Sequence, residues 1–248
     1  MRQNGYAGAV SGQTPQRGEL AGAMAGLAGT PDDSPSVDGR LAAIARLAAG
    51  RVRAAEYASI TALRGAAYTS VVVSDELIQA VDDAQYRDEA GPCVEALRDG
   101  APVAVPDVGA IVRWPGFHEE AAQLGLHASV SVPLFAGRGE AVAVLNVYGR
   151  DHVAMAPLIA GILVVHGGLG RDDVDEAQLT ELDAGGEELV AGYAAALDVR
   201  ATIKLAVRLI GAARECGPDE AYLVLCARAE EAGTDLADVA ADLVKNGL

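Results

Sequence analysis

Residues 126–149, LHASVSVPLFAGRGEAVAVLNVYG, contain the pattern that decides the fold. Two β-rich runs, Leu126–Phe135 and Ala141–Tyr148, flank the tripeptide Gly137-Arg138-Gly139. Two such runs separated by a short glycine-containing segment are typical of a β-hairpin. We therefore predict an antiparallel pair of strands here, joined by a tight turn.

The residues before this hairpin predict the rest of a sheet and its helices. The runs Tyr57–Arg64 and Tyr68–Ser74, separated by Gly65, predict a second hairpin. We also expect a strand at Ala101–Val108 and helices at residues 36–53, at Asp75–Tyr86, after Gly91-Pro92 and at Trp114–Leu124. Five or six strands with helices between them predict an α+β domain built on an antiparallel sheet.

The longest apolar run, Met155–Val165, predicts either a buried helix or a strand. It is about half of the roughly 20 residues that span a bilayer, so we expect no membrane contact. No basic stretch followed by an apolar one begins the chain, and the three cysteines lack a paired CxxC spacing. We therefore expect a cytoplasmic protein with reduced thiols, in which Cys93 is a small buried residue rather than a reactive one.

The formal net charge of the 248 residues is −16, and the acids are unevenly distributed. This charge argues against sequence-blind binding to nucleic acid or anionic membranes, because the summed field repels phosphate. Residues 151–198 hold one arginine against ten acidic residues, and we interpret them as an acidic helical connector. Adjacent acids such as Asp82-Asp83 and Glu187-Glu188 point about 100° apart on a helix, so we interpret them as solvated charges.

The segment after the connector reads as three helices, at Val199–Arg214, from Pro218 to Gly233, and from Thr234 to about Lys245. On a helical wheel, the cations of the first helix lie opposite its apolar residues, and no acid interrupts them. These cations, here called the basic stripe, are Arg200, Lys204, Arg208 and Arg214. The stripe predicts either a phosphate-contacting surface or a solvated face whose cations pair with acids elsewhere, such as the connector.

Four regions follow from these patterns. Residues 1–35 are rich in Gly, Ser, Gln and Pro, and predict a disordered tail with a short helix near Glu19–Leu27. Residues 36–150 form the α+β domain. Residues 151–198 are the connector, which completes or leaves that domain, and residues 199–248 are the helical bundle.

Several strings within these regions resemble known families. "DEAGPCVEALRDGAPVAVPDV" (88–108), "RWPGF" (113–117), "ASVSVPLF" (128–135) and "AVAVLNVYGR" (141–150) are similar, in order and spacing, to a GAF domain of the actinobacterial type. The C-terminal strings "GPDEAYLVLCARAEE" (217–231) and "TDLADVAADLV" (234–244) resemble an ANTAR domain. The chain therefore resembles GAF–ANTAR transcription antitermination regulators.

This resemblance implies a sensor coupled to an RNA-binding output. GAF domains commonly bind small molecules or dimerise, and ANTAR domains are three-helix bundles that bind paired RNA hairpins and prevent transcription termination. It implies structured RNA as a partner of the basic stripe and of Tyr222, which matches an aromatic position of the family, and we expect a homodimer. Candidate residues for an unknown small-molecule ligand in the sensor are Trp114, Phe117, His127, Ser129, Ser131 and Tyr148.

No cofactor, metal-ligand spacing or enzyme motif is identified in the sequence, so we expect no catalysis. The alternative is a protein-interaction or dimerisation module whose degenerate bundle no longer binds RNA. It is favoured by departures from the ANTAR pattern at Ala206-Val207-Arg208, Leu225-Cys226, Asp235 and Ala237. The contact face would then be alanine-rich and include Ala237, Val239, Ala240 and Leu243. A further hypothesis is that connector acids between Asp172 and Glu188 pair with the stripe and shield it.

Overall fold

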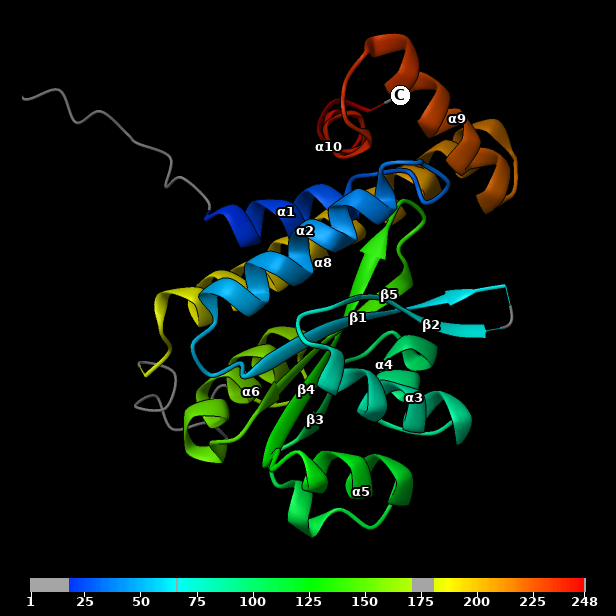
Figure 1. Ribbon diagram of the computed structural model, residues 1–248. Coiled ribbons are helices and arrows are strands. Elements are labelled where there is room, and N and C mark those ends of the chain that lie inside the picture. Colours follow the sequence, from blue (N-terminus) through cyan, green and yellow to red (C-terminus); the bar gives the residue numbers. More distant parts are fainter. Residues whose placement is uncertain (1–17, 66, 171–180, 248) are drawn as a thin grey trace, which may run out of the picture.

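The computed structural model describes residues 18–65, 67–170 and 181–247, and its centre is the hairpin expected at residues 126–149 (Figure 1). Strands β4 (Ala128–Ala136) and β5 (Glu140–Gly149) pair antiparallel along their whole length. The other strands are β1 (Tyr57–Arg64), β2 (Ala67–Val73) and β3 (Val103–Val105). They form an antiparallel sheet of order β2-β1-β5-β4-β3, which confirms the predicted antiparallel α+β fold.

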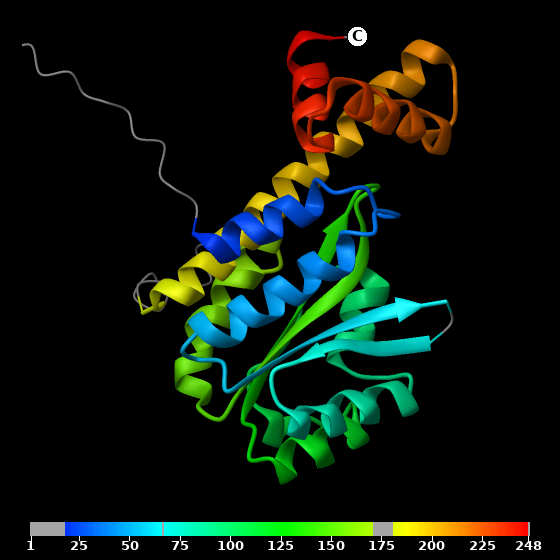
Figure 2. The ribbon, with the colours of Figure 1, turned by 45° about the horizontal axis from the view of Figure 1, so that its top comes forward.

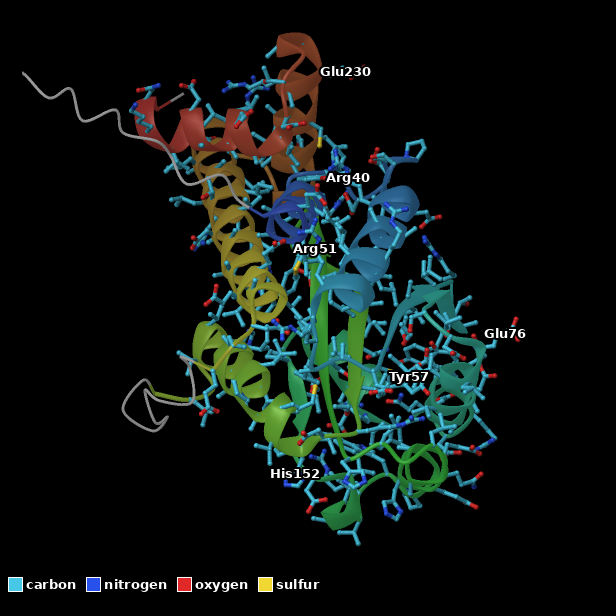
Figure 3. The ribbon with its side chains drawn as sticks, turned by 60° about the vertical axis from the view of Figure 1, so that its left-hand side comes forward. Arg40, Arg51, Tyr57, Glu76, His152 and Glu230 are labelled. Atoms are coloured by element: carbon cyan, nitrogen blue, oxygen red, sulfur yellow. The ribbon has the colours of Figure 1, made fainter. Side chains whose placement is uncertain are left out.

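Side chains alternate between the two faces of a strand, and the residues that point to one face of this sheet are apolar. Ile60, Val132 and Leu145 point to this face and are fully buried. Four helices cover it: α1 (Glu19–Ala28), α2 (Val37–Arg51), α6 (His152–His166) and the first half of α8 (Ala184–Arg214). At one end of this layer, Arg51 pairs with Glu19 of α1 and Glu188 of α8 (Figure 3).

The opposite face carries polar side chains at the alternate positions, including Thr61, Ser131 and Asn146. It is covered by the short helices η1 (Glu76–Ile78), α3 (Gln79–Arg87), α4 (Pro92–Asp99), η2 (Val108–Ala110) and α5 (Pro115–Gln123). The Gly91-Pro92 start of α4 is confirmed, with proline in the first helical turn.

Helix α8 leaves the sheet and continues into a C-terminal bundle with α9 (Pro218–Ala232) and α10 (Leu236–Asn246) (Figure 2). Ile203, Leu225 and Leu243, one from each helix, belong to the separate core of this bundle. The three expected C-terminal helices are therefore present.

Three sequence expectations need correction. The short helix expected near Glu19–Leu27 is confirmed as α1, but this part of the expected tail is not disordered, because Leu20, Met24 and Leu27 are buried against α8 and the sheet. Residues 1–17 lie outside the described residues. The strand expected at 101–108 is only Val103–Val105. The helix expected from Val199 begins at Ala184, so the boundary proposed at residue 199 falls inside α8.

The first part of the predicted connector, which was expected to complete or leave the α+β domain, packs on the sheet of that domain. The open choice for Met155–Val165 is settled as a helix, α6, whose Met155, Leu158 and Ile162 are buried against the sheet. Gly185 is the second residue of α8. A Cβ atom at this position would lie 2.0 Å from the carbonyl oxygen of Arg51, so only glycine allows α8 to approach α2 this closely. None of the helices in the described part of the chain is long and apolar enough to cross a membrane.

Candidate functional site

The basic stripe lies on the second half of α8, where the chain passes from the sheet to the bundle. Arg200, Lys204 and Arg208 are spaced four residues apart and therefore follow one another along one side of the helix. Arg200 and Lys204 are partly buried, whereas Arg208 and Arg214 are exposed. The structure thus divides the stripe into two halves with different surroundings.

The first half contacts the turn between β4 and β5, residues 137–140, here called the hairpin tip. The Nε atom of Arg200 donates to the carbonyl oxygen of Gly139 at 2.6 Å, and its guanidinium lies 4.2 Å from the ring centroid of Phe135. The Nζ atom of Lys204 lies 3.5 Å from Oε1 of Glu140. Two of the four cations are therefore held by the sensor domain.

Glycine at position 139 makes this contact possible. Its φ of +82° is a left-handed conformation that other residues rarely adopt. A Cβ atom here would also lie 2.8 Å from Cε of Lys204 and 2.9 Å from Cγ of Arg200. The turn therefore brings its backbone against α8 only because it lacks a side chain.

In the described part of the chain, Arg208 and Arg214, the second half of the stripe, make no hydrogen bond or ion pair with the hairpin tip. Nε of Arg208 donates to the carbonyl oxygen of Lys204 at 3.2 Å. Neither Arg208 nor Arg214 makes an ion pair with any residue in the described ranges. These two side chains remain available to an anion from outside the chain.

Tyr222 of α9 is held by the same hairpin tip and by the segment between α1 and α2. The Arg138 guanidinium lies 4.7 Å from its ring centroid, and its hydroxyl donates to Oδ1 of Asp32 at 2.8 Å. Arg138 in turn pairs with Asp32 at 3.4 Å and with Asp219 at 2.5 Å. Burial and the hydrogen bond to Asp32 raise the pKa of the Tyr222 hydroxyl, so it remains a donor. With 4 % of its surface exposed, this ring is not open to a stacking base in the present arrangement.

The connector acids do not shield the stripe in the described part of the chain. Asp183 lies near Arg53 at 3.8 Å, and Glu188 pairs with Arg51 of α2 at 3.1 Å. The acids at 172–176 lie outside the described residues. The contacts to the stripe and to Tyr222 instead come from Gly139, Glu140, Arg138 and Asp32. Sequence reasoning missed these four, because the turn was identifiable but its distant packing partner was not.

The six candidate ligand residues of the sensor do not form a single site. Trp114 and Phe117 pack edge to face at 6.3 Å in an apolar cluster that includes Tyr148. Nε1 of Trp114 donates to Oε1 of Glu95 at 2.9 Å. His127 is exposed and stacks on His152, at the end of the molecule away from the bundle (Figure 3).

Ser131 and Tyr148 belong to a buried hydrogen-bond network on the polar face of the sheet. Oγ of Ser131 donates to Oδ1 of Asn146 at 2.8 Å, and Nδ2 of Asn146 donates to Oγ1 of Thr61 at 2.9 Å. The hydroxyls of Thr61 and Tyr86 are 2.8 Å apart, which extends the network to α3. Ser129, also buried, has an Oγ atom without a partner in the described structure.

Asp82 is the residue of this network that sequence reasoning misjudged. Its place in an adjacent acid pair predicts a solvated side chain, but Asp82 is fully buried and accepts hydrogen bonds from Tyr148 at 2.8 Å and from Ser70 at 3.0 Å. Burial raises the pKa of Asp82 to about 6, and it also raises the pKa of Tyr148. Asp83 is the exposed member of the pair, so the helix turns one acid inward and one outward.

Cys93 lies beside this network and is fully buried, as expected. Burial, followed by the nearby Asp82, raises the pKa of its thiol, which opposes formation of a reactive thiolate. Among the residues that the structure describes, no group of His, Cys, Asp and Glu side chains could hold a metal ion.

Comparison with known protein families identifies the sheet-containing domain and the C-terminal bundle independently. A family model described as a GAF domain matches residues 34–182, and a model described as an ANTAR domain matches residues 191–244. No curated protein matches the chain. The GAF match includes α6, and the ANTAR match begins within α8, upstream of the basic stripe. Both are regulatory families and generally not enzymes: in general terms they support ligand sensing by the first and RNA-binding antitermination by the second. The chain thus belongs to the GAF domain family and carries an ANTAR domain at its C-terminal end.

Proposed function

We propose that this chain is a cytoplasmic signal-responsive regulator whose ANTAR bundle binds structured RNA and whose GAF domain controls that binding. The observation that carries the proposal is the hairpin tip, which contacts Arg200, Lys204 and Tyr222 at the same time. Those three residues are the ones through which RNA phosphates and a base would be contacted. The described arrangement is then the inactive state.

The contacts that hold the two domains together suit a reversible switch. In the ion pairs Lys204–Glu140 and Arg138–Asp219, the acids are 81 % and 87 % exposed and the cations 38 % and 39 %. Solvent therefore screens both pairs, and such pairs contribute roughly 0.2–1 kcal/mol each. The cation–ring contacts Arg138–Tyr222 and Arg200–Phe135 involve buried rings, and a desolvated contact of this kind contributes about 2 kcal/mol. The hydrogen bonds Arg200–Gly139 and Tyr222–Asp32 add to these contacts, so a signal at the GAF domain releases the hairpin tip only by binding the open arrangement more tightly than the closed one.

Release would unite the two halves of the stripe. Arg208 and Arg214 already face solvent, and the freed Arg200 and Lys204 would extend their surface along α8. RNA would gain affinity from each cation by counterion release, which makes the binding dependent on salt. The open state would thus bind RNA more tightly than the closed state.

Charge reversal tests the RNA surface. Arg208→Glu with Arg214→Glu should abolish the shift of a tandem-hairpin RNA in a gel titration, and single variants should each lower the slope of log K against log salt by about one. Arg46→Glu, an exposed arginine of α2, is the matched control and should leave the slope unchanged. Equal affinities for all of these proteins would exclude the stripe as the RNA site.

A protein-interaction module remains the second candidate, and one observation favours it. Leu205 and Leu209 of α8 are 40 % and 38 % exposed and lie one helical turn apart, which is suited to pairing with a second copy. The face first expected to serve this purpose is less suitable, because Ala240 and Leu243 are buried inside the bundle. Sedimentation of the wild type against Leu205→Glu tests this homodimer, and a monomeric wild type would exclude it.

A further inference from the structure

A cleft of about 380 Å³ lies where the hairpin tip meets α8 and α9. Arg138 and Glu140 form its wall on the GAF side, and the ANTAR side is formed by residues of α8 and the start of α9. Its volume falls within the range of small-molecule sites, and domain boundaries are common places for such sites. The cleft is separate from the buried polar network on the GAF sheet.

Two cations in this cleft are incompletely neutralised. Arg208 lines it and has no carboxylate partner in the described part of the chain, and its Nε contacts only the backbone of its own helix. Lys204, one turn earlier, is 3.5 Å from Glu140, a side chain that is 81 % exposed. The other carboxylate that lines the cleft, Asp219, is paired with Arg138 at 2.5 Å. An anion placed between Lys204 and Arg208 would therefore find two donors and displace the weak Lys204–Glu140 ion pair.

The rest of the cleft is apolar enough to hold an organic group. Val207 of α8, Pro218 at the start of α9 and the Tyr222 side chain line it. Arg138 already lies over the Tyr222 ring, which fixes that side chain as part of the wall. Inorganic phosphate alone would leave this apolar part of the cleft unfilled.

We propose that this cleft binds a small organic phosphate, with its phosphate on Lys204 and Arg208 and its apolar body against Val207, Pro218 and Tyr222. Arg138 of the GAF domain forms the wall of the cleft beside Tyr222, so the complete cleft exists only in the closed arrangement, and a ligand held in it stabilises that arrangement. The ligand then lowers the affinity of the bundle for RNA, a consequence that rests on the proposed function. The binding itself does not depend on RNA.

Calorimetric titration of the full chain with phenyl phosphate tests the site directly. The expected result is saturable binding at least tenfold tighter than that of inorganic phosphate, and no binding of phenol. Arg208→Ala should weaken phenyl phosphate at least tenfold. Arg214→Ala is the matched control, because it removes the same charge from the same helix but does not line the cleft, and it should retain wild-type affinity.

The proposal is overturned if phenyl phosphate binds no tighter than inorganic phosphate, or if both arginine variants lose affinity equally. A competition with tandem-hairpin RNA separates this site from the RNA surface. Arg214→Ala should weaken the binding of RNA and leave the affinity for phenyl phosphate unchanged. If no variant changes the affinity for RNA, the proposed RNA surface is wrong. The proposed cleft is tested separately, by the calorimetric titration alone.

Discussion

The hydroxyl of Tyr222 in α9 donates a hydrogen bond to the carboxylate of Asp32, which precedes it by 190 residues, at a distance of 2.8 Å. The same carboxylate pairs with Arg138 of the hairpin tip. One acid between α1 and α2 therefore joins the GAF hairpin to the ANTAR bundle. The α1–α2 segment, as well as the GAF hairpin, therefore contacts the aromatic residue proposed to bind RNA.

Removal of this acid should favour the open state. Asp32→Ala deletes the acceptor of Tyr222 and one partner of Arg138, so we expect the apparent RNA affinity to rise about fivefold, the equivalent of roughly 1 kcal/mol. Fluorescence anisotropy with a tandem-hairpin RNA measures it. Asp33→Ala removes an identical charge from an exposed neighbour, and its small effect should reflect net charge alone. Equal increases for the two variants would contradict a specific role of Asp32.

Adding a single methyl group at Gly139 should weaken the contact between the hairpin tip and α8. Gly139→Ala should cost about 1 kcal/mol of stability through its positive φ and, in addition, push the turn away from Arg200 and Lys204. Gly65→Ala in the β1–β2 turn is the control, since Gly65 also has a positive φ, of +64°, but a Cβ atom there meets nothing within 4 Å. Both variants should unfold more easily in urea, and only Gly139→Ala should bind RNA more tightly. Unchanged RNA affinity in Gly139→Ala would argue against the contact.

Asp82 should make stability depend on pH. Its pKa is raised by burial from near 3.8 to about 6, so between these values the folded chain holds a proton that the unfolded chain has released. The free energy of unfolding therefore falls as pH rises through this window, by on the order of 3 kcal/mol. Asp82→Asn carries no charge and should remove this loss.

Urea unfolding of wild type and Asp82→Asn at pH 4.5 and pH 7.5 measures this effect. The quantity compared is the difference in unfolding free energy between the two proteins, because their other carboxylates titrate in the same way and cancel. The stability of Asp82→Asn relative to wild type should increase with pH. Asp83→Asn, at the exposed neighbour, should show little change. A difference between Asp82→Asn and wild type that is the same at both pH values would show that Asp82 does not titrate as proposed.

The three thiols should react in order of burial. Cys216 and Cys226 are half-buried and should react with a disulfide reagent in the native protein, with Cys226 the slower because burial raises its pKa. Cys93 should react only after unfolding, and Cys93→Ala should abolish that last step. Rapid native labelling of all three thiols would contradict the burial of α4 against the sheet.

Local patterns in the sequence were sufficient for most elements of the fold. The two β-rich runs and the glycine-containing turn in residues 126–149 predicted the β4–β5 hairpin, and proline and glycine residues at helix ends located α4 and α9. The short helix predicted near Glu19–Leu27 is confirmed as α1, but its burial was not predictable, because Leu20, Met24 and Leu27 pack on α8, more than 150 residues away in the sequence, and on the sheet. Tertiary packing decided that segment.

The candidate site was predictable only in part, for a related reason. The spacing of Arg200, Lys204 and Arg208 defines a helical stripe from local sequence alone. That Gly139 and Glu140 cover half of it depends on how α8 passes the end of the hairpin, which no local pattern encodes. The burial of Asp82 was missed because an acid at an inward position is recognisable only once its hydroxyl partners from β2 and β5 are placed.

The central claim is that the hairpin tip holds the ANTAR RNA surface in a closed state, and the RNA affinity of Arg138→Ala tests it most directly. Arg138 contacts Tyr222, Asp32 and Asp219 but lies outside the stripe. Arg113→Ala is the matched control, because Arg113 also lies over an aromatic ring and pairs with an acid, but within the GAF domain at Trp114 and Glu95. In anisotropy titrations with tandem-hairpin RNA, we predict that Arg138→Ala binds about fivefold more tightly than wild type, although it has lost a cation, and that Arg113→Ala does not. Weaker or unchanged binding by Arg138→Ala would contradict the closed state.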